Sequence, residues 1–218
     1  MPLPPLIPPV SVTPYLASSA LISCTHEVIR KCARENTSTT LDETNQIGGL
    51  YRFVRDKIAH SGDIGQTSLV WKAHRVVTAG HALCFGKSHL LTALCRAVGI
   101  PAGLCYQRVK RSDGTYVLHG LTAIWLEDEG RWIRLDARGN IPGIAAEFNP
   151  SGPEQIAYPD MKDPGEWLAP QIYADPWEEI IRTYEHAENV IRFIEATASI
   201  QIPEQPISRV MPIPAAQG

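Results

Sequence analysis

The apolar residues of this chain change their spacing at Gly99-Ile100-Pro101. Before that point they recur every three or four residues, which is the period of an amphipathic helix. After it, segments 102–109, 116–128 and 131–137 alternate or run apolar and are rich in β-branched and aromatic residues, as strands are. Helices followed by strands, rather than alternating with them, predict an α+β fold with segregated layers.

Three helices are predicted ahead of the glycine at position 80. The first has an apolar face formed by Leu21, Cys24, Val28 and Cys32. Its two cysteines are therefore expected to face the core. The second carries an apolar stripe over residues 47–58, and the third is expected to be capped by Thr67 or Ser68 and to stop at Gly80.

A fourth helix is predicted to begin near Cys84 and to end at Gly99 and Pro101, the usual order of terminating residues. The three strands that follow are separated by the turn sequences SDG and EDEG, which favour an antiparallel meander. Residues 138–167 are rich in proline and glycine and are expected to wrap over the surface.

A last helix is predicted to begin at Asp175-Pro176, a capping residue followed by proline in the first turn. Four residues are expected to face inward from it: Ile180, Ile181, Tyr184 and Ile194. With no internal repeat or linker, the expected organisation is a proline-rich extended arm over residues 1–17, one domain over residues 18–202 and a loose tail over residues 203–218.

Composition excludes several classes of function. The net charge is only −3 and the basic residues form no run, which argues against a nucleic-acid surface. No apolar stretch is long enough to span a bilayer, so no membrane partner is expected. Because prolines interrupt the apolar N-terminus and no basic segment precedes it, a signal peptide is not expected, and a cytoplasmic location is predicted.

The five cysteines are an odd number and form no CxxC pair, so neither a structural zinc site nor a redox dithiol is predicted. Most are expected to be reduced and inert. His60 and Asp63 could hold a metal, but a loop after a helix is the favoured interpretation of that segment. The sequence therefore predicts neither a metal nor a cofactor.

Cys84 differs from the other cysteines because it lies where a glycine-containing turn becomes a helix. Unpaired N–H groups and the helix dipole at such a position favour the thiolate, which is the form that attacks a carbonyl. The backbone N–H of Cys84 is also a natural donor to an oxyanion.

A cysteine nucleophile needs a base, and the base needs a group that orients it. His119 lies in an otherwise apolar strand and is followed by Gly120, which leaves room for a close approach. Asp136 ends the next strand. In a hairpin of these two strands, His119 and Asp136 are expected to lie side by side at one end of the sheet. Each residue alone has a more ordinary structural interpretation.

Three segments in this order resemble the transglutaminase-like superfamily, which includes transglutaminases, peptide N-glycanases and many bacterial cysteine peptidase-like proteins. The first, GHALCFGKSHLLTALCRAVGIPAGLCYQRV over residues 80–109, is similar to the family's nucleophile helix. The second, LHGLTAIWL, is similar to its histidine strand, and the third, RWIRLDARGN, to its aspartate strand. The resemblance covers residues 45–150 well and is strongest to a compact microbial-type subgroup.

The resemblance implies a papain- or transglutaminase-like core, in which the nucleophile helix packs on an antiparallel sheet between flanking helices. It also implies a catalytic triad of Cys84, His119 and Asp136. One departure is that Gly80 stands four positions before the cysteine, where many relatives have glycine closer to it. The family's second oxyanion donor is often a Trp or Gln upstream, so Gln66 and Trp71 are candidates here. His81 could contribute a local donor or be a solvated turn residue.

The expected function is attack of Cys84 on an amide or ester carbonyl of a peptide or small molecule, giving a thioester acyl-enzyme. Transfer of the acyl group to an amine is slightly favoured over hydrolysis by a peptidase or amidase. A non-catalytic binding module is the alternative from another class. The sequence does not predict the oligomeric state.

Overall fold

The computed structural model describes residues 3–200, so the tail expected over residues 203–218 lies outside the described residues. Its centre is an antiparallel sheet with the strand order β5-β4-β3-β6. The strands are β3 (Ala102–Lys110), β4 (Tyr116–Leu126), β5 (Arg131–Leu135) and β6 (Trp167–Leu168). The predicted meander is confirmed as β3-β4-β5, and its two turns each contain a glycine with positive φ, Gly114 and Gly130. The short edge strand β6 was not predicted.

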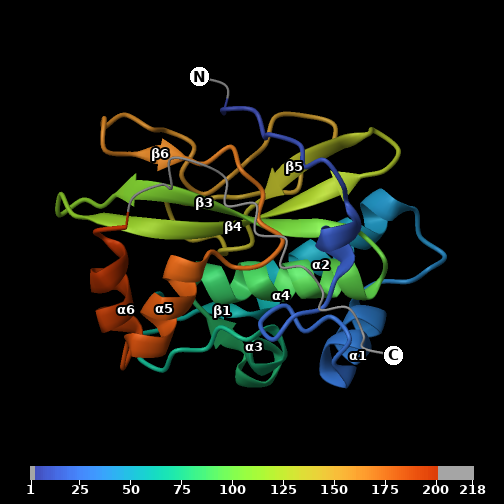
Figure 1. Ribbon diagram of the computed structural model, residues 1–218, viewed down its shortest axis with the longest axis horizontal. Helices are drawn as coiled ribbons and strands as arrows, with labels where there is room; N and C mark the ends of the chain where they lie inside the picture. The colour runs from blue at the N-terminus through green and yellow to red at the C-terminus, as the bar shows by residue number, and fades with distance from the viewer. Residues whose placement is uncertain (1–2, 201–218) are drawn as a thin grey trace, which may run out of the picture.

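Helix α4 (Cys84–Ala97) lies against one face of this sheet (Figure 1). Every α4 residue from Cys84 to Arg96 is buried. A helix that is enclosed on all sides is expected to be mostly apolar, but this one also buries five polar side chains, Lys87, Ser88, His89, Thr92 and Arg96. It ends where predicted, with Gly99 in the left-handed region at φ 86°. The predicted α+β fold, with a helix packed on an antiparallel sheet, is confirmed.

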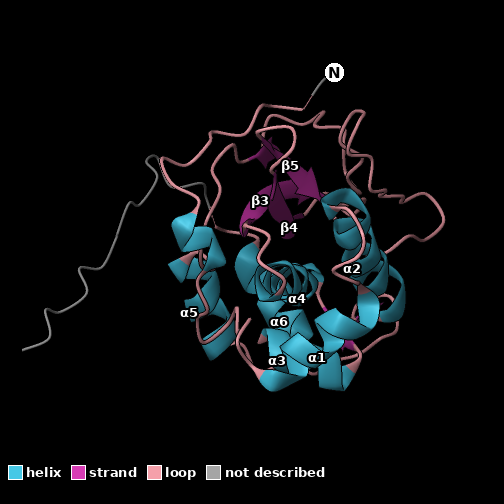
Figure 2. Ribbon diagram, turned by 90° about the vertical axis from the view of Figure 1, so that its right-hand side faces the viewer, coloured by secondary structure: helices cyan, strands magenta, loops and turns pink. Residues whose placement is uncertain are grey.

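Three helices and a small parallel sheet pack against α4, with α1 and α3 beneath it and α2 at its side (Figure 2). They are α1 (Glu27–Asn36), α2 (Glu43–Lys57), α3 (Ala73–Ala79), and the strands β1 (Ala59–His60) and β2 (His81–Ala82). The pairing of β1 with β2 joins Ala59 to His81 and His60 to Ala82. This pairing brings the end of α2 beside the residues that lead into α4.

Three of the predicted helix starts were wrong. The last predicted helix begins at Glu178, with Trp177 as an N-cap that makes no side-chain hydrogen bond, and not at Asp175-Pro176. Helix α1 begins only at Glu27, because the side chain of His26 accepts a hydrogen bond from the N–H of Val28 and caps it. Cys24 is buried, as expected, but lies ahead of the helix. Helix α3 begins at Ala73 without a side-chain cap, so neither Thr67 nor Ser68 starts it. Its predicted end is confirmed at Gly80, which has φ 70°.

The last predicted helix is two helices, α5 (Glu178–His186) and α6 (Val190–Thr197). Asn189 separates them, and its side chain caps α6 by accepting from the N–H of Arg192. Ile180 and Tyr184 are buried as predicted, but Phe193 rather than Ile194 is fully buried in α6. Both helices lie at the end of the sheet where β3 turns into β4 (Figure 1).

The N-terminal segment crosses the face of the sheet opposite α4 (Figure 1). The expected extended arm contains a short 3₁₀ helix, η1 (Thr13–Leu16). Tyr15 is buried there, packs on Trp132, and donates its hydroxyl hydrogen to the carbonyl of Ile172 at 2.8 Å. The sheet therefore has a core on each face. None of the helices within residues 3–200 combines the length and apolarity that crossing a bilayer requires.

Candidate active site

Cys84 is the first residue of α4, and the extended backbone of Leu83 leads into it. Its side chain points toward β4, where the backbone N–H of Gly120 lies 3.4 Å from the sulfur. The residue is only 8% exposed, and this small exposed part opens into a pocket. The helix start and the Gly120 donor both favour a negative charge on this sulfur.

The structure brings His119 and Asp136 together at the edge of the sheet. Thr122 and Leu135 are the last residues paired between β4 and β5, so His119 and Asp136 lie just beyond the end of the paired region. The Nε2 atom of His119 is 2.8 Å from Oδ2 of Asp136, and both side chains are buried. Because Nε2 is taken by the carboxylate, Nδ1 is the ring nitrogen left for Cys84.

Backbone donors hold the Asp136 carboxylate in place. The N–H of Arg138 donates to Oδ1 at 3.0 Å, and the N–H of Ala157 donates to Oδ2 at 2.9 Å. The ring of Tyr158 meets His119 edge-on, with 5.0 Å between the ring centroids. The loop that was expected to wrap over the surface therefore also orients the buried pair.

The charges in the site stabilise one another. Burial alone raises the pKa of Cys84, but hydrogen bonds and charge from His119 and His60 outweigh it and bring this pKa down to about 6. Burial disfavours charged His119, yet Asp136 and then Cys84 raise the pKa of His119 well above its ordinary value. Burial likewise opposes ionisation of Asp136, but His119 lowers its pKa. These directions favour a thiolate–imidazolium pair supported by a carboxylate at neutral pH.

The remaining cysteines form a contrast within the same chain. All five are free and buried. Burial raises the pKa of Cys32 to about 11 and that of Cys105 to about 12, and it also raises the pKa of Cys95. Burial raises the pKa of these thiols, so the lowered pKa of Cys84 comes from its neighbours and not from its burial.

A second histidine, His60 of β1, lines the same pocket as Cys84 and helps to lower the pKa of its thiol. Its Nδ1 lies 3.4 Å from Oδ1 of Asp63, and both carboxylate oxygens of Asp63 accept from the guanidinium of Arg138, at 2.9 and 2.7 Å. The sequence interpretation of His60 and Asp63 as an ordinary loop missed this arrangement. Only the β1–β2 pairing brings His60 to the start of α4, so no local pattern indicated it.

Lys87 ties the segment that carries His60 to α4. It is buried one turn after Cys84, and its Nζ donates to the carbonyls of Arg55, at 3.2 Å, and Ile58. Burial, followed by the positive charge of Arg138, lowers the pKa of Lys87 to about 8. These bonds satisfy carbonyls at the end of α2, just before β1.

The three residues proposed from sequence as further donors lie elsewhere. Gln66 is exposed. Trp71 stacks on Tyr184 with 4.6 Å between ring centroids. His81 shares a hydrogen bond of 3.0 Å with the hydroxyl of Ser61. None of the three lines the pocket at Cys84. His60 lines it instead, because the pairing of β1 with β2 places His60 there.

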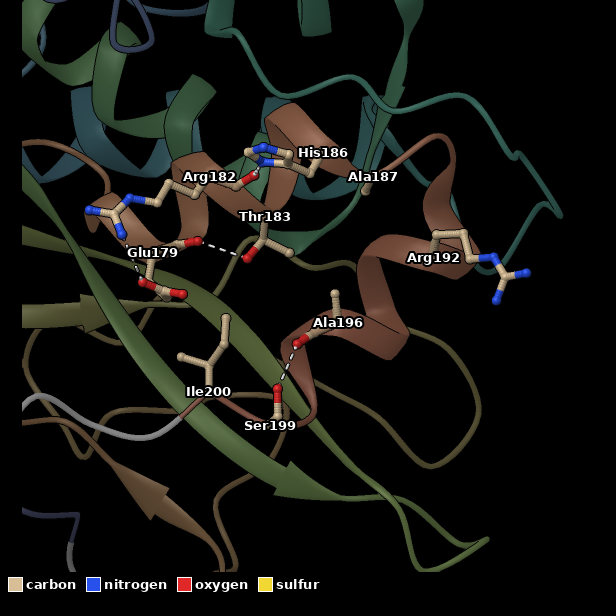
Figure 3. Close-up of a pocket in the computed structure, with 9 residues that line it drawn as sticks. All are labelled: Glu179, Arg182, Thr183, His186, Ala187, Arg192, Ala196, Ser199 and Ile200. Carbon is tan, nitrogen blue, oxygen red and sulfur yellow. Dashed lines mark hydrogen bonds and ion pairs between the residues drawn. The ribbon is translucent and has the colours of Figure 1, made fainter.

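The pocket at Cys84, called here the Cys84 pocket, has a volume of about 450 Å³. Its polar wall consists of His60, Asp63, His119, Arg138 and Tyr158. Its other wall comes from the end of the β3–β4 hairpin and from α6. A second pocket, between α5 and α6 (Figure 3), is separate, since it shares no lining residue with the first. Arg182 and Arg192 at that pocket are paired with glutamates of their own helices.

Within residues 3–200 no group of three or more His, Cys, Asp or Glu side chains is arranged to hold a metal ion. Metal independence stays a prediction. The chemistry that the described site can perform without one is nucleophilic attack by sulfur, with His119 moving the proton.

The sequence pattern of the transglutaminase-like superfamily core matches residues 30–137, a range that contains Cys84, His119 and Asp136. This chain carries a transglutaminase-like superfamily domain. No curated protein matches it significantly.

Two solved structures resemble the transglutaminase-like chain. One is a candidate cysteine protease from Cytophaga hutchinsonii, with 20% identity, a TM-score of 0.50, and coverage of 61% of this chain and 45% of that one. The other is described as a TGase, with 18% identity, a TM-score of 0.41, and coverage of 64% and 37%. The chain thus spans less than half the length of either. The first likeness supports the fold.

Proposed function

We propose that this transglutaminase-like protein is a cysteine enzyme that forms a thioester acyl-enzyme on Cys84 and passes the acyl group to an amine. The observation that carries the proposal is the placement of Cys84 at the start of α4, beside the hydrogen-bonded pair of His119 and Asp136. His119 and His60 lower the pKa of this buried thiol to about 6. A buried thiolate is costly unless neighbouring charges stabilise it, and such groups are concentrated at sites of catalysis.

In the first half of the cycle the Cys84 thiolate attacks the carbonyl carbon of an amide or ester, and the carbonyl electrons move to oxygen. The backbone N–H of Cys84 and the side chain of His60 are the donors proposed for this oxyanion. His119 then gives its Nδ1 proton to the leaving amine or alcohol as its bond to carbon breaks. Asp136 keeps the imidazole in the orientation that leaves Nδ1 facing sulfur.

In the second half, His119 takes a proton from the attacking amine, the new bond to carbon forms, and Cys84 leaves as the thiolate. Water at the same position gives hydrolysis instead. The small exposure of Cys84 supports transfer, since a nucleophile with little access to solvent leaves its thioester less open to bulk water. The proposed partners are a peptide or small-molecule donor and an amine acceptor.

The test is intact-mass spectrometry after incubation with an activated ester, with and without a primary amine. Acylation of wild type but not of Cys84→Ala, followed by appearance of the amide product, supports acyl transfer. If the free acid is released instead, at a rate that the amine does not change, the reaction is hydrolysis and not acyl transfer. No mass increase, together with intact folding, overturns the enzyme proposal in favour of a binding module.

A further inference from the structure

Two elements that meet only in the tertiary structure contribute apolar side chains to the Cys84 pocket. The β3–β4 hairpin contributes Val109 and Val117, and α6 contributes Phe193 and Ile194. We call these four residues the apolar subsite. Val109 and Phe193 are buried, while Val117 and Ile194 are partly exposed toward the pocket.

Strand register places the apolar subsite beside the reacting atoms. Val109 pairs directly with Val117, and two residues further along the strands Gln107 pairs with His119. Residues two apart on a strand share a face and are separated by about 7 Å. The valine pair therefore lies on the same face of the sheet as His119, about 7 Å along the strands from it.

Helix α6 is joined to the nucleophile through an aromatic contact. Phe193 packs edge-on against Phe85, which directly follows Cys84, with 5.3 Å between ring centroids. Ile194 is the next residue along α6 and lines the same pocket. The apolar subsite is thus continuous with the position where a substrate carbonyl must sit to be attacked.

Three of the polar groups at the border of the apolar subsite have partners, while Arg111, 3.9 Å from Asp113, and Ser112 line the pocket further out, at the hairpin turn. Lys110 pairs with Asp163 at 2.5 Å, and Arg138 pairs with Asp63. The hydroxyl of Thr197 donates to the carbonyl of Ile194 at 2.9 Å. A charged or amide side chain of a substrate would lose its hydration here without gaining a partner, whereas an aliphatic chain loses little.

We propose that the substrate of this site carries an aliphatic acyl group, of about four to eight carbons, which lies on the apolar subsite while its carbonyl faces Cys84. This inference rests on the proposed function, since it names the acyl group that Cys84 would accept. With an aryl ester, the Cys84 S–C bond forms, the ester C–O bond breaks, and the phenol leaves with the proton of His119.

The turnover experiment follows acylation by p-nitrophenyl esters of two, four, six and eight carbons. The second-order rate constant is expected to rise by up to about fourfold for each methylene that is buried. Ile194→Asn is expected to reduce the hexanoyl-to-acetyl ratio by about tenfold or more. Ile191→Asn is the matched control on the same helix, because Ile191 is 58% exposed, and it should leave that ratio unchanged.

A binding experiment separates this inference from the proposed function. Cys84→Ala is titrated with acetamide and hexanamide, which cannot react with it. Tighter binding of hexanamide, lost in the Cys84→Ala, Ile194→Asn double variant, supports the apolar subsite. If at the same time no ester acylates wild type, only the proposed enzymatic function is overturned. Equal binding of the two amides, or acylation rates independent of chain length, would overturn the apolar subsite even if Cys84 is acylated.

Discussion

The backbone N–H of Gly120 lies 3.4 Å from the sulfur of Cys84. Strand β4 therefore supplies two groups to the nucleophile, this backbone donor and the side chain of His119. This approach is possible because position 120 has no side chain. A Cβ there would lie 3.0 Å from a ring carbon of Phe85 and 3.1 Å from its Cα. The close packing of β4 on the start of α4 therefore depends on this glycine.

Gly120→Ala should push α4 away from β4. We expect a loss of about 1–3 kcal/mol of unfolding free energy, typical of overpacking, and a higher pKa for Cys84 as the donor retreats. Urea denaturation measures the first, and the pH dependence of alkylation measures the second. A variant with wild-type stability and an unchanged Cys84 pKa would show that the contact is not needed.

Alkylation of Cys84 should reach its full rate at a lower pH than that of an ordinary thiol. The thiolate predominates above the pKa of about 6, whereas a free cysteine has a pKa near 8.5. Iodoacetamide labelling from pH 5 to pH 9, read by peptide mapping, should therefore show a midpoint near 6 for Cys84. Cys105, whose pKa burial raises to about 12, should stay unlabelled.

The same experiment tests the part played by His119. In His119→Asn the principal group that lowers the Cys84 pKa is gone, so the labelling midpoint should move upward by more than one pH unit. For turnover, the reactive ion pair exists only below the raised pKa of His119, so activity should fall again on the alkaline side. A midpoint unaffected by His119→Asn would contradict the proposed ion pair.

His60→Ala should reduce kcat by about 10²–10³, the effect of losing one oxyanion donor, with a smaller change in KM. The ester assay measures both constants. The matched control is His81→Ala, since His81 belongs to the strand paired with β1 but does not line the Cys84 pocket. Equal effects of the two substitutions would show that His60 serves only the local structure.

His89 should make the fold sensitive to acid. It is fully buried, its Nδ1 lies 2.7 Å from the carbonyl of Trp71, and its Nε2 has no partner. Burial is the main cause of the lowered pKa of His89, about 4. Because the folded-state pKa is depressed, the unfolded chain binds this proton first, and stability falls as the pH drops from 6.5 toward 4.

Between pH 8 and pH 5 this difference corresponds to about 2 kcal/mol of unfolding free energy. His89→Asn keeps a donor for the Trp71 carbonyl without a titrating ring, so it should lose that part of the pH dependence. Urea denaturation at the two pH values gives the measurement, with the exposed His186→Asn as control. An identical pH dependence in wild type and His89→Asn would refute the assignment.

Much of the fold and the first part of the site could be predicted because they depend on local patterns. The helical stripe before Gly99 and the alternation after Pro101 predict the layers, and the turns between consecutive strands bring His119 and Asp136 together. The break at Asn189 was missed although asparagine is a favoured cap, since the apolar spacing continued across it.

What the sequence by itself determined about this protein is therefore what neighbouring residues decide: the periods of helix and strand, the turns, and a cysteine at a helix start. Only the tertiary structure decided that His60, and not Gln66 or Trp71, lines the pocket of Cys84, and that α6 and the valine pair line that pocket too. The physical reason is that these contacts depend on how distant segments pair and pack. Hydrogen bonding between β1 and β2 and burial of Phe193 set those positions. Neither can be recognised from a repeating pattern of apolar residues in the sequence.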